Sequence, residues 1–350
     1  MSISPNSNST DNKLARAARP LNIKEFAEAI GVSPTTVSRS ITQRGRVSEE
    51  TRAMVLQRMD ELGYSPNLHA QRLISGRSNT VALCLSGGSA PASDLFLAGL
   101  IRGLQQALQF YDNGLLILGP GDMLRRWVDS RAVDGVIIIG GSSHDDRLAR
   151  ESARPGVPCV LIGTAALPVE NNVGQVVIDL AGGSARVARA LFERGHRRIG
   201  FIGSSYSQSV LPAFQRELKE LGAPLAPELT VIAGDNSEDG ERAMSEMLKL
   251  PAPPTAVFAR TDELAVGALR GAHQNGVSVP DQLSLVGHDD LAYARFSEPP
   301  LSTVRIDCDA VGKAVVATLF EMIDQPDVAA VPRIVPTELV LRHSVAALDI

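Results

Sequence analysis

From residue 80 onward the sequence alternates between short apolar runs and longer amphipathic stretches, and this alternation limits the possible folds more than any other feature. Strands buried on both faces read as continuous apolar runs, whereas covering helices repeat apolar residues every three or four positions. The pattern predicts strands at 81–85, 115–118, 135–139, 158–162, 176–178, 199–202, 256–258 and 283–286, and helices such as 95–110, 181–194, 262–275 and 309–323. Strands that alternate with helices form parallel sheets covered on both faces. Because this part of the chain is too long for one such sheet, we predict an α/β body of two doubly wound lobes, divided near 176–180 and 290–330.

Three short helices with recognisable caps precede this body, at 21–64. We expect them to begin after Asn22, Ser33 and Ser48, and Glu25 completes a capping-box pattern with Asn22. The expected inward residues are Ile23, Phe26, Ala27 and Ile30, then Val37 and Ile41, then Met54, Val55, Met59 and Leu62. Two short helices joined by a Gly-containing turn, followed by a third, predict an all-α helix-turn-helix headpiece.

The second helix of this headpiece would present small hydrogen-bonding side chains and one guanidinium. These are Thr35, Thr36, Ser38, Arg39 and Thr42. Groups of this kind can approach phosphates and base edges closely. Charge favours the same interpretation, because residues 1–77 hold 11 Lys/Arg and 7 Asp/Glu (+4), which leaves 23 and 32 (−9) for 78–350. A basic head on an acidic body is expected when only the head contacts nucleic acid.

Two segments flank the headpiece. Residues 1–20 are rich in Ser and Asn and lack the apolar core of a signal peptide, so we expect a disordered leader. Residues 65–79 begin like a helix, with Ser65 at the N-cap and Pro66 at the first position, but such a helix is too short to be stable alone. The segment is therefore either a passive tether or a helix that orders only in a complex.

The headpiece resembles that of the LacI/GalR family of bacterial transcription regulators. The resemblance rests on GVSPTTVSR, VSEETR, LGYSPN and AQRLISG, and runs without a gap from residue 22 to about 80. It implies that the helix beginning at Ser33 enters the major groove, where Pro34, Thr35 and Arg39 would read bases. Ser33, Thr36, Ser38 and Thr42 would fall at phosphate-contacting positions, and Asn22 is included among the DNA-binding residues. The segment 65–79 would be the hinge helix, with Ala70 and Leu73 in the minor groove and Leu73 acting as an apolar wedge.

The body resembles the effector domain of the same family, which shares its fold with periplasmic sugar-binding proteins. GHRRIGFIG, RTDELAVGAL, GVSVPDQLSLVGHDD and PPLSTV carry this resemblance. It implies a small-molecule effector in the cleft between the lobes, since ligands of such sheets bind at the carboxyl ends of the strands. The candidate effector-binding residues are Ser86, Asp94, Phe96, Asp262, His288 and Asp289. For Asp262, capping of the helix that starts there is the alternative.

Three departures from the family pattern concern the effector. Val210 falls where the family often has a ligand-chelating arginine, and His288 falls where an aromatic residue such as Phe is common. The strand–helix–strand unit containing GPGDMLRRWVDSRAVDG is also several residues shorter than usual. These departures indicate an effector other than a standard pyranose, or an unusual mode of binding.

The sequence thus predicts a ligand-responsive regulator of transcription, a repressor that binds a near-palindromic operator as a homodimer in the cytoplasm. A small-molecule-binding protein of the periplasmic-binding class, without a DNA role, is the alternative. An enzyme is the third possibility, but no cofactor-binding loop or nucleophile–base set is found, and no membrane span is expected. Cys84, Cys159 and Cys308 lie far apart, so we expect neither disulfide nor metal site, and no cofactor.

Overall fold

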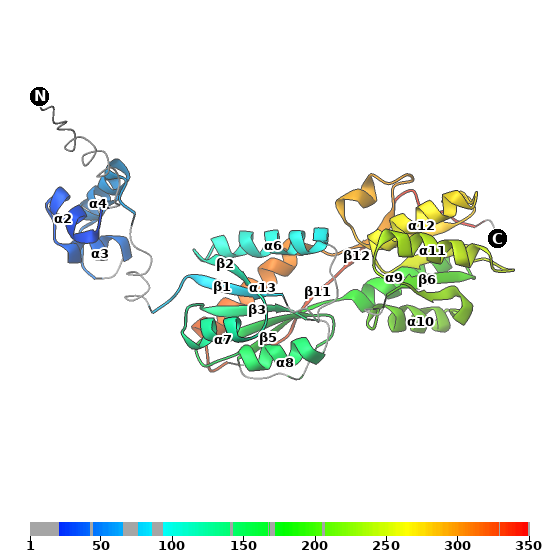
Figure 1. Cartoon of the computed structure of the whole chain (residues 1–350), viewed down its shortest axis with the longest axis horizontal. Coiled ribbons are helices and arrows are strands. Elements are labelled where there is room, and N and C mark those ends of the chain that lie inside the picture. The colour runs from blue at the N-terminus through cyan, green and yellow to red at the C-terminus, as the bar shows by residue number, and fades with distance from the viewer. Residues whose placement is uncertain are drawn as a thin grey trace, which may run out of the picture. The chain divides into compact units, whose positions relative to one another are not determined.

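The computed structural model describes residues 21–42, 45–65, 76–85, 94–140, 143–166, 168, 172–204, 207–328 and 330–348. They form two compact units, residues 1–77 and 78–350, which are considered separately (Figure 1). The expectations for 1–20 and for most of 65–79 lie outside the described residues.

The first unit contains the three predicted helices, α2 (Ile23–Ile30), α3 (Pro34–Thr42) and α4 (Glu49–Leu62). The capping box is confirmed: Asn22 Oδ1 accepts the backbone N–H of Glu25 at 3.0 Å, and Glu25 Oε2 accepts that of Asn22 at 2.8 Å. Gly31 ends α2 in the left-handed conformation (φ 73°), as predicted, which turns the chain toward α3 within three residues.

A small aromatic and aliphatic core holds these helices together. Phe26 and Val55 are fully buried, and the ring of Phe26 stacks on that of Tyr64 with centroids 4.2 Å apart. The expectation that Leu62 points inward is wrong, because 43% of it is exposed. Leu62 is the last residue of α4, and Tyr64, beyond the left-handed Gly63, fills the core instead.

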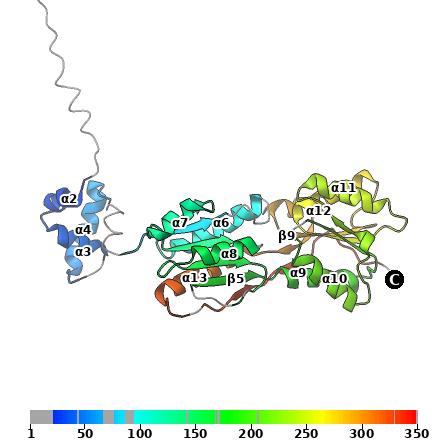
Figure 2. The same ribbon diagram turned by 60° about the horizontal axis from the view of Figure 1, so that its bottom comes forward.

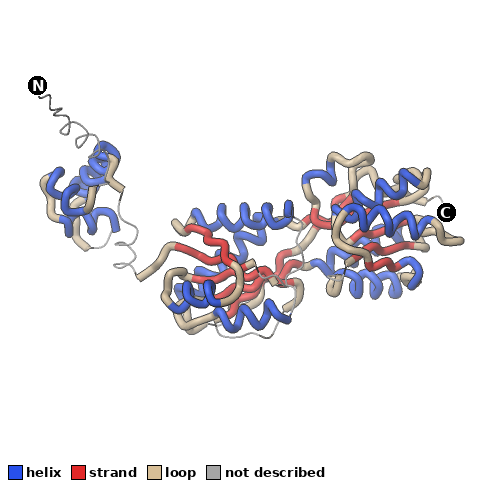
Figure 3. Tube along the Cα trace, in the orientation of Figure 1, coloured by secondary structure: helices blue, strands red, loops and turns tan. Residues whose placement is uncertain are grey.

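The second unit contains two six-stranded sheets (Figure 3). The first has the order β11-β5-β4-β3-β1-β2 and is parallel throughout. Its strands are β1 (Thr80–Cys84), β2 (Gly114–Leu118), β3 (Gly135–Ile139), β4 (Cys159–Gly163), β5 (Val173–Ile178) and β11 (Arg333–Val335). Helices α6 (Asp94–Gln109) and α13 (Cys308–Asp324) cover one face, and α7 (Asp122–Asp129) and α8 (Ser143–Ser152) the other (Figure 1).

The second sheet has the order β12-β10-β9-β8-β6-β7. Its strands are β6 (Ile199–Gly203), β7 (Thr230–Ile232), β8 (Ala256–Ala259), β9 (Ser284–Asp289), β10 (Ser302–Arg305) and β12 (Glu338–Val340). Helices α9 (Leu180–Glu193) and α10 (Val210–Glu220) pack on one face, and α11 (Ser237–Leu248) and α12 (Asp262–Gln274) on the other (Figure 2). Two short 3-10 turns, η1 (Pro227–Leu229) and η2 (Ala292–Arg295), complete this lobe. The prediction of a purely parallel sheet is wrong for β12, which pairs antiparallel with β10.

The chain passes between the two sheets three times: after β5 at Asp179, after β10 at 306–307, and between β11 and β12 at 336–337. The first and third passages are bonded to each other, because Thr337 Oγ1 donates to the carbonyl of Asp179 (2.9 Å) and Arg186 Nη2 donates to that of Thr337 (2.6 Å). Beyond β12 the chain runs back along the second sheet, where Ser344 Oγ accepts the N–H of Ser302 at 2.8 Å. The third passage was not expected from the sequence.

Substitution of the buried Phe26 tests whether the headpiece and the body unfold as separate units. Phe26→Ala should cost about 3–5 kcal/mol of unfolding free energy, as much as the total stability of many small domains. We expect calorimetry of the full chain to show the headpiece transition lost or strongly lowered and that of the body unchanged. Leu62→Ala, at an exposed site, is the matched control; a common shift of both transitions would contradict separate units.

Candidate functional site

The exposed face of α3 is the first candidate site. Ser33, Pro34, Thr35 and Arg39 are all exposed, whereas Thr36, Ser38 and Thr42 are half-buried. Thr35 and Arg39 are four residues apart, so they lie one above the other on the same side of the helix. Val37 faces the opposite way, into the headpiece core. The helix therefore presents one hydroxyl and one guanidinium together to solvent.

Hydrogen bonds hold the neighbouring polar groups of α3 in place. Ser33 Oγ accepts the backbone N–H of Thr36 at 3.0 Å, as an N-cap does, and Thr42 Oγ1 donates to the carbonyl of Ser38 at 2.8 Å. Asn22 Oδ1 is engaged in capping α2. Ser33 and Asn22 thus cap the starts of α3 and α2, and Thr42 bonds within the last turn of α3.

Gly45 was not identified from the sequence, yet it makes room for Arg39. A Cβ at Gly45 would lie 3.2 Å from both Cδ and Nε of Arg39, and the residue has a φ of +85°. A side chain would be strained there and would press on the guanidinium stem. A positive-φ glycine is recognisable only once the loop geometry is known.

Several candidate residues fall partly or wholly outside the described residues. Ala70, Leu73 and Ser86 do so completely, and Asp94 is the first residue of α6 with a side chain that is not described. Phe96, also on α6, is half-buried and packs against the main apolar cluster.

The carboxyl edge of the second sheet brings the remaining candidates together. The strand order reverses between β6 and β8, which is the topological switch point where open α/β sheets bind ligands. Asp262 follows β8, and His288 and Asp289 are the last two residues of β9, the next strand along the sheet. Sequence reasoning therefore selected residues from adjacent strand ends.

Asp262 is fully buried and bonded to two other segments. Its Oδ2 accepts the N–H of Leu291 at 2.7 Å, and its Oδ1 accepts the hydroxyl of Thr303 at 2.5 Å. The alternative that Asp262 caps α12 is wrong, because Thr261 occupies the N-cap and accepts the N–H of Leu264 at 3.1 Å. Both Asp262 oxygens thus fix the turn after β9 and the adjacent strand β10.

His288 is also fully buried, with Nδ1 2.9 Å from Asp289 Oδ1. Burial lowers the pKa of His288, so the neutral imidazole is favoured and Nδ1–H donates to the carboxylate. This tautomer leaves a lone pair on Nε2, which has no hydrogen-bond partner among the described residues. Asp289 has a positive φ of 110°, a conformation that side-chain-bearing residues rarely adopt.

The next residue, Asp290, is held between two arginines. Its carboxylate accepts from Arg305 Nε at 2.6 Å and from Arg342 Nη2 at 2.5 Å. Burial acts against ionisation, but these bonds outweigh it and lower the pKa of Asp290. Both guanidiniums are thereby occupied.

Val210, which falls where the family often has a ligand-chelating arginine, is the first residue of α10. It is fully buried in the apolar cluster with Phe214 and Phe258. It therefore serves packing, and any cation that contacts an effector here must come from another element.

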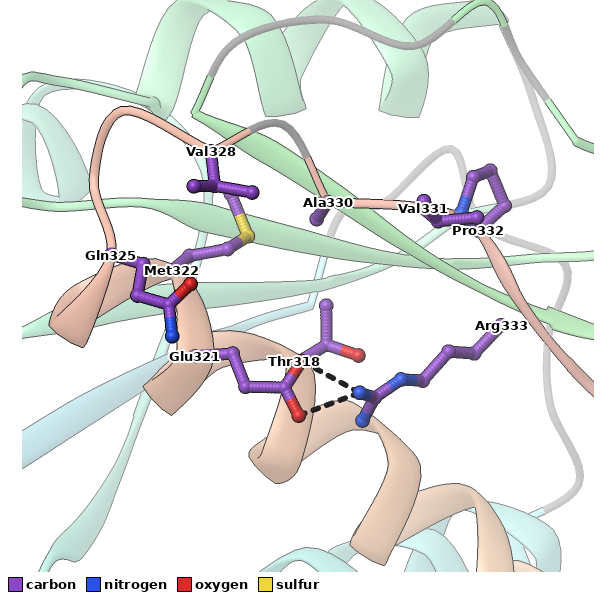
Figure 4. A pocket seen from close by; sticks show the side chains of 9 residues that line it. All are labelled: Thr318, Glu321, Met322, Gln325, Val328, Ala330, Val331, Pro332 and Arg333. Atoms are coloured by element: carbon purple, nitrogen blue, oxygen red, sulfur yellow. Dashed lines mark hydrogen bonds and ion pairs between the residues drawn. The ribbon is translucent and has the colours of Figure 1, made fainter.

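A cavity of about 380 Å³ lies elsewhere, between α13 and the segment that leads into β11 (Figure 4). Arg333 Nη2 bonds both carboxylate oxygens of Glu321 at 2.6 Å along one side of it. Arg333 begins β11, so the cavity lies at the amino ends of the parallel strands, away from the candidate effector residues.

Other chemistries receive no support from the described residues. Among them no three His, Cys, Asp or Glu side chains form a group that could hold a metal ion. Cys84 and Cys159 are free and buried. In the described part of the chain, no helix is both long and apolar enough to cross a membrane.

The buried carboxyl of Asp262 generates a pH prediction. Burial, with the charge of Asp289, raises its pKa well above the usual value, so the folded protein holds this proton more tightly than the unfolded chain. The contribution of Asp262 to the free energy of unfolding must then fall as the pH rises above about 3.9, the unfolded value. Asp262→Asn has no proton to lose, so its stability relative to wild type should increase from about pH 4 to 7 in urea unfolding. Asp281→Asn, at an exposed position, is the control, and a difference that stays constant with pH would contradict the assignment.

Two family models match the chain. Residues 22–67 match "Bacterial regulatory proteins, lacI family", and residues 188–345 match "Periplasmic binding protein-like domain". The HTH-type transcriptional regulator DegA of Bacillus subtilis is 32% identical over 93% of this chain and 98% of its own length. The first range covers the headpiece helices, and the second covers most of the second lobe together with α13 and β11 of the first.

Two solved structures extend the comparison to three dimensions. The complex of the transcriptional regulator CelR with cellobiose is 29% identical with a TM-score of 0.66, covering 93% of this chain and all of that one. The lac repressor dimer bound to operator and the anti-inducer ONPF shares the fold, with a TM-score of 0.79 at 22% identity over 94% of this chain and all of that one. The curated relatives of this chain named here and others like them are regulators of transcription rather than enzymes. The chain belongs to the lacI family of bacterial regulatory proteins, with a helix-turn-helix DNA-binding domain and a periplasmic-binding-protein-like ligand-binding domain.

Proposed function

We propose that the protein is a repressor that binds a near-palindromic operator as a homodimer, in the cytoplasm, and responds to a small molecule held between its lobes. The observation that carries this proposal is the exposed face of α3, where Thr35 and Arg39 project together from a helix fixed by its caps. Arginine can bond the O6 and N7 atoms of guanine simultaneously, which is the commonest base-specific contact.

The DNA contacts fall into three groups. Pro34, Thr35 and Arg39 would meet base edges, and because proline offers no side-chain donor, Thr35 and Arg39 would supply the direct readout. Asn22, Ser33, Thr36, Ser38 and Thr42 would position the headpiece on phosphates. Ala70 and Leu73 of the hinge segment would enter the minor groove, with Leu73 as the wedge.

A homodimer is supported by the edge of the first lobe. Strand β2 is the edge strand of its sheet, and it exposes Ile117 (47%), while Leu95 on α6 (51%) and Met123 on α7 (53%) are also exposed. Exposed apolar side chains on a free strand edge, and on the helices that precede and follow that strand, favour an interaction surface. Two headpieces on a dimeric body would match the two halves of a near-palindromic operator.

The effector would lie at the carboxyl edges of the two sheets. Ser86, Asp94 and Phe96 would contact it from the first lobe, and Asp262, His288 and Asp289 belong to the second. Because both oxygens of Asp262 bond within the protein, we assign it the role of positioning Asp289 rather than direct contact. A ligand that binds one lobe arrangement better than another by a few kcal/mol would change operator occupancy substantially.

Substitution of Arg39 tests the DNA-binding role. Arg39→Ala should weaken binding to the selected operator by about 1–3 kcal/mol, or roughly 5- to 150-fold, and relax the preference at the base it contacts. The measurement is fluorescence anisotropy with operators obtained by selection from random DNA, at fixed salt. Arg58→Ala, on the exposed side of α4, should bind like wild type. Wild-type protein that selects no sequence, or Arg39→Ala that binds unchanged, would refute the proposal.

Substitution at the strand edge tests the dimer. Ile117→Glu would place a charge in the interface, so sedimentation should show monomers where the wild type is dimeric. Val328→Glu, at a 60% exposed site in the same lobe, should leave the dimer intact. A monomeric wild type, or an Ile117→Glu variant that remains dimeric, would rule out this surface.

A further inference from the structure

Three polar atoms at the carboxyl edge of the second sheet are buried without any hydrogen-bond partner. They are Nε of Arg260, Nε2 of His288 and the hydroxyl of Tyr293, three of only seven such atoms among the described residues. Leaving a buried donor or acceptor unsatisfied costs about 1–3 kcal/mol. Such a concentration at one sheet edge indicates groups whose partner is a ligand.

Arg260 and His288 lie on the same face of the sheet. The N–H of Arg260 bonds the carbonyl of Ile202 at 2.8 Å, which extends the β8 ladder by one residue. Alternation along the strand then places the Arg260 side chain on the face of Phe258. His288 is on this face too, with its ring centroid 6.4 Å from that of Phe258. The positive charge of Arg260 also acts on His288, whose pKa it helps to lower.

This face is also where Val210 lies. Val210 is one helical turn before Phe214, whose ring centroid is 5.1 Å from that of Phe258. A chelating arginine at position 210 of α10 and the side chain of Arg260 after β8 would therefore reach the same region. This region lies beside the switch point between β6 and β8. The guanidinium absent from α10 is available from β8.

The guanidinium of Arg260, unlike those of the neighbouring arginines, has no partner among the described residues. Arg305 and Arg342 both bond the carboxylate of Asp290, whereas the side chain of Arg260 forms no hydrogen bond or ion pair with the described residues. A partly buried guanidinium favours a counter-charge, and a carboxylate can bond it through two parallel N–H···O contacts. The lone pair of His288 Nε2 needs a donor instead, such as a hydroxyl.

We propose that Arg260 and His288 recognise an effector that is a hydroxylated organic carboxylate, with the guanidinium bonding its carboxylate and His288 Nε2 accepting from a hydroxyl. The assignment rests on the proposed function, because it names the ligand class of the same interlobe site. A monoanion fits better than a phosphate dianion, since the guanidinium of Arg260 is one positive charge without a partner among the described residues and Asp289 is a negative charge beside His288.

The test uses the full-length protein and three pairs of probes that differ mainly by a carboxylate: D-glucuronate and D-glucose, D-galacturonate and D-galactose, D-gluconate and D-glucitol. Calorimetric titration should show at least one acid binding tenfold or more tightly than its neutral partner. For that acid, Arg260→Gln should raise the Kd by about 10- to 100-fold, the range expected for charge-assisted bonds. Arg260→Lys, which keeps the charge but not the fork, should lose less.

Two further variants make the result specific. Arg295→Gln, at an exposed arginine of η2, should bind the acid like wild type. His288→Phe should raise the Kd of the acid and that of its neutral partner by similar factors, because the hydroxyl is common to both. Acids that bind no better than their partners, failure of all six probes, or an Arg260→Gln variant with wild-type affinity would each overturn the assignment.

Operator binding without probe separates this assignment from the proposed function. Arg260→Gln should bind the operator like wild type when no probe is present. If the wild-type protein binds an acid but no operator, the proposed function is refuted and the ligand class stands. If it binds an operator but no acid, the ligand class alone is refuted.

Discussion

Two of the three segments that pass between the sheets, the first and the third, are bonded to each other, and these bonds fix where the two lobes join. Arg186 reaches from α9 to Thr337, and Thr337 reaches back to Asp179, so the first and third passages form one unit. Gly183 lets them approach, since a Cβ there would lie 2.6 Å from Thr337 Oγ1. A change of the angle between the lobes would have to preserve or break these hydrogen bonds.

In the second lobe, a network of buried polar and charged side chains fixes the turn after β9 at the carboxyl edge of the sheet. Asp262 ties the turn after β9 to β10, and Asp290 ties the same turn to Arg305 and Arg342. Between these two fixed carboxylates lies Asp289, in a strained backbone conformation. Removing one partner from a buried pair costs far more than the pair contributes in net stability, so such networks specify geometry better than they stabilise.

Most of the architecture could be predicted from the sequence, and the failures have physical causes. Long apolar strands such as β3 and capped helices such as α2 were predicted because their local signals and their burial agree. The strands β7, β10, β11 and β12 were not predicted because they contain three or four residues of mixed polarity. Pairing with neighbours, rather than their own pattern, makes them strands. Arg260 was missed for a similar reason, since a lone arginine after an apolar run looks like a surface residue until the ladder that orients it is known.

The position of the crossing segments along the chain has a consequence for the order of folding. Strand β11 and helix α13 belong to the first sheet's lobe, yet they follow every strand of the second sheet except β12 in the sequence. During synthesis, residues 80–178 therefore emerge without the helix that covers one face of their sheet and without its last strand. The second lobe likewise lacks its edge strand β12 until the end of the chain has been translated. The first lobe can be completed only after most of the second has been translated, and the second is completed last. A partly made chain therefore contains the whole headpiece before either lobe of the body is complete.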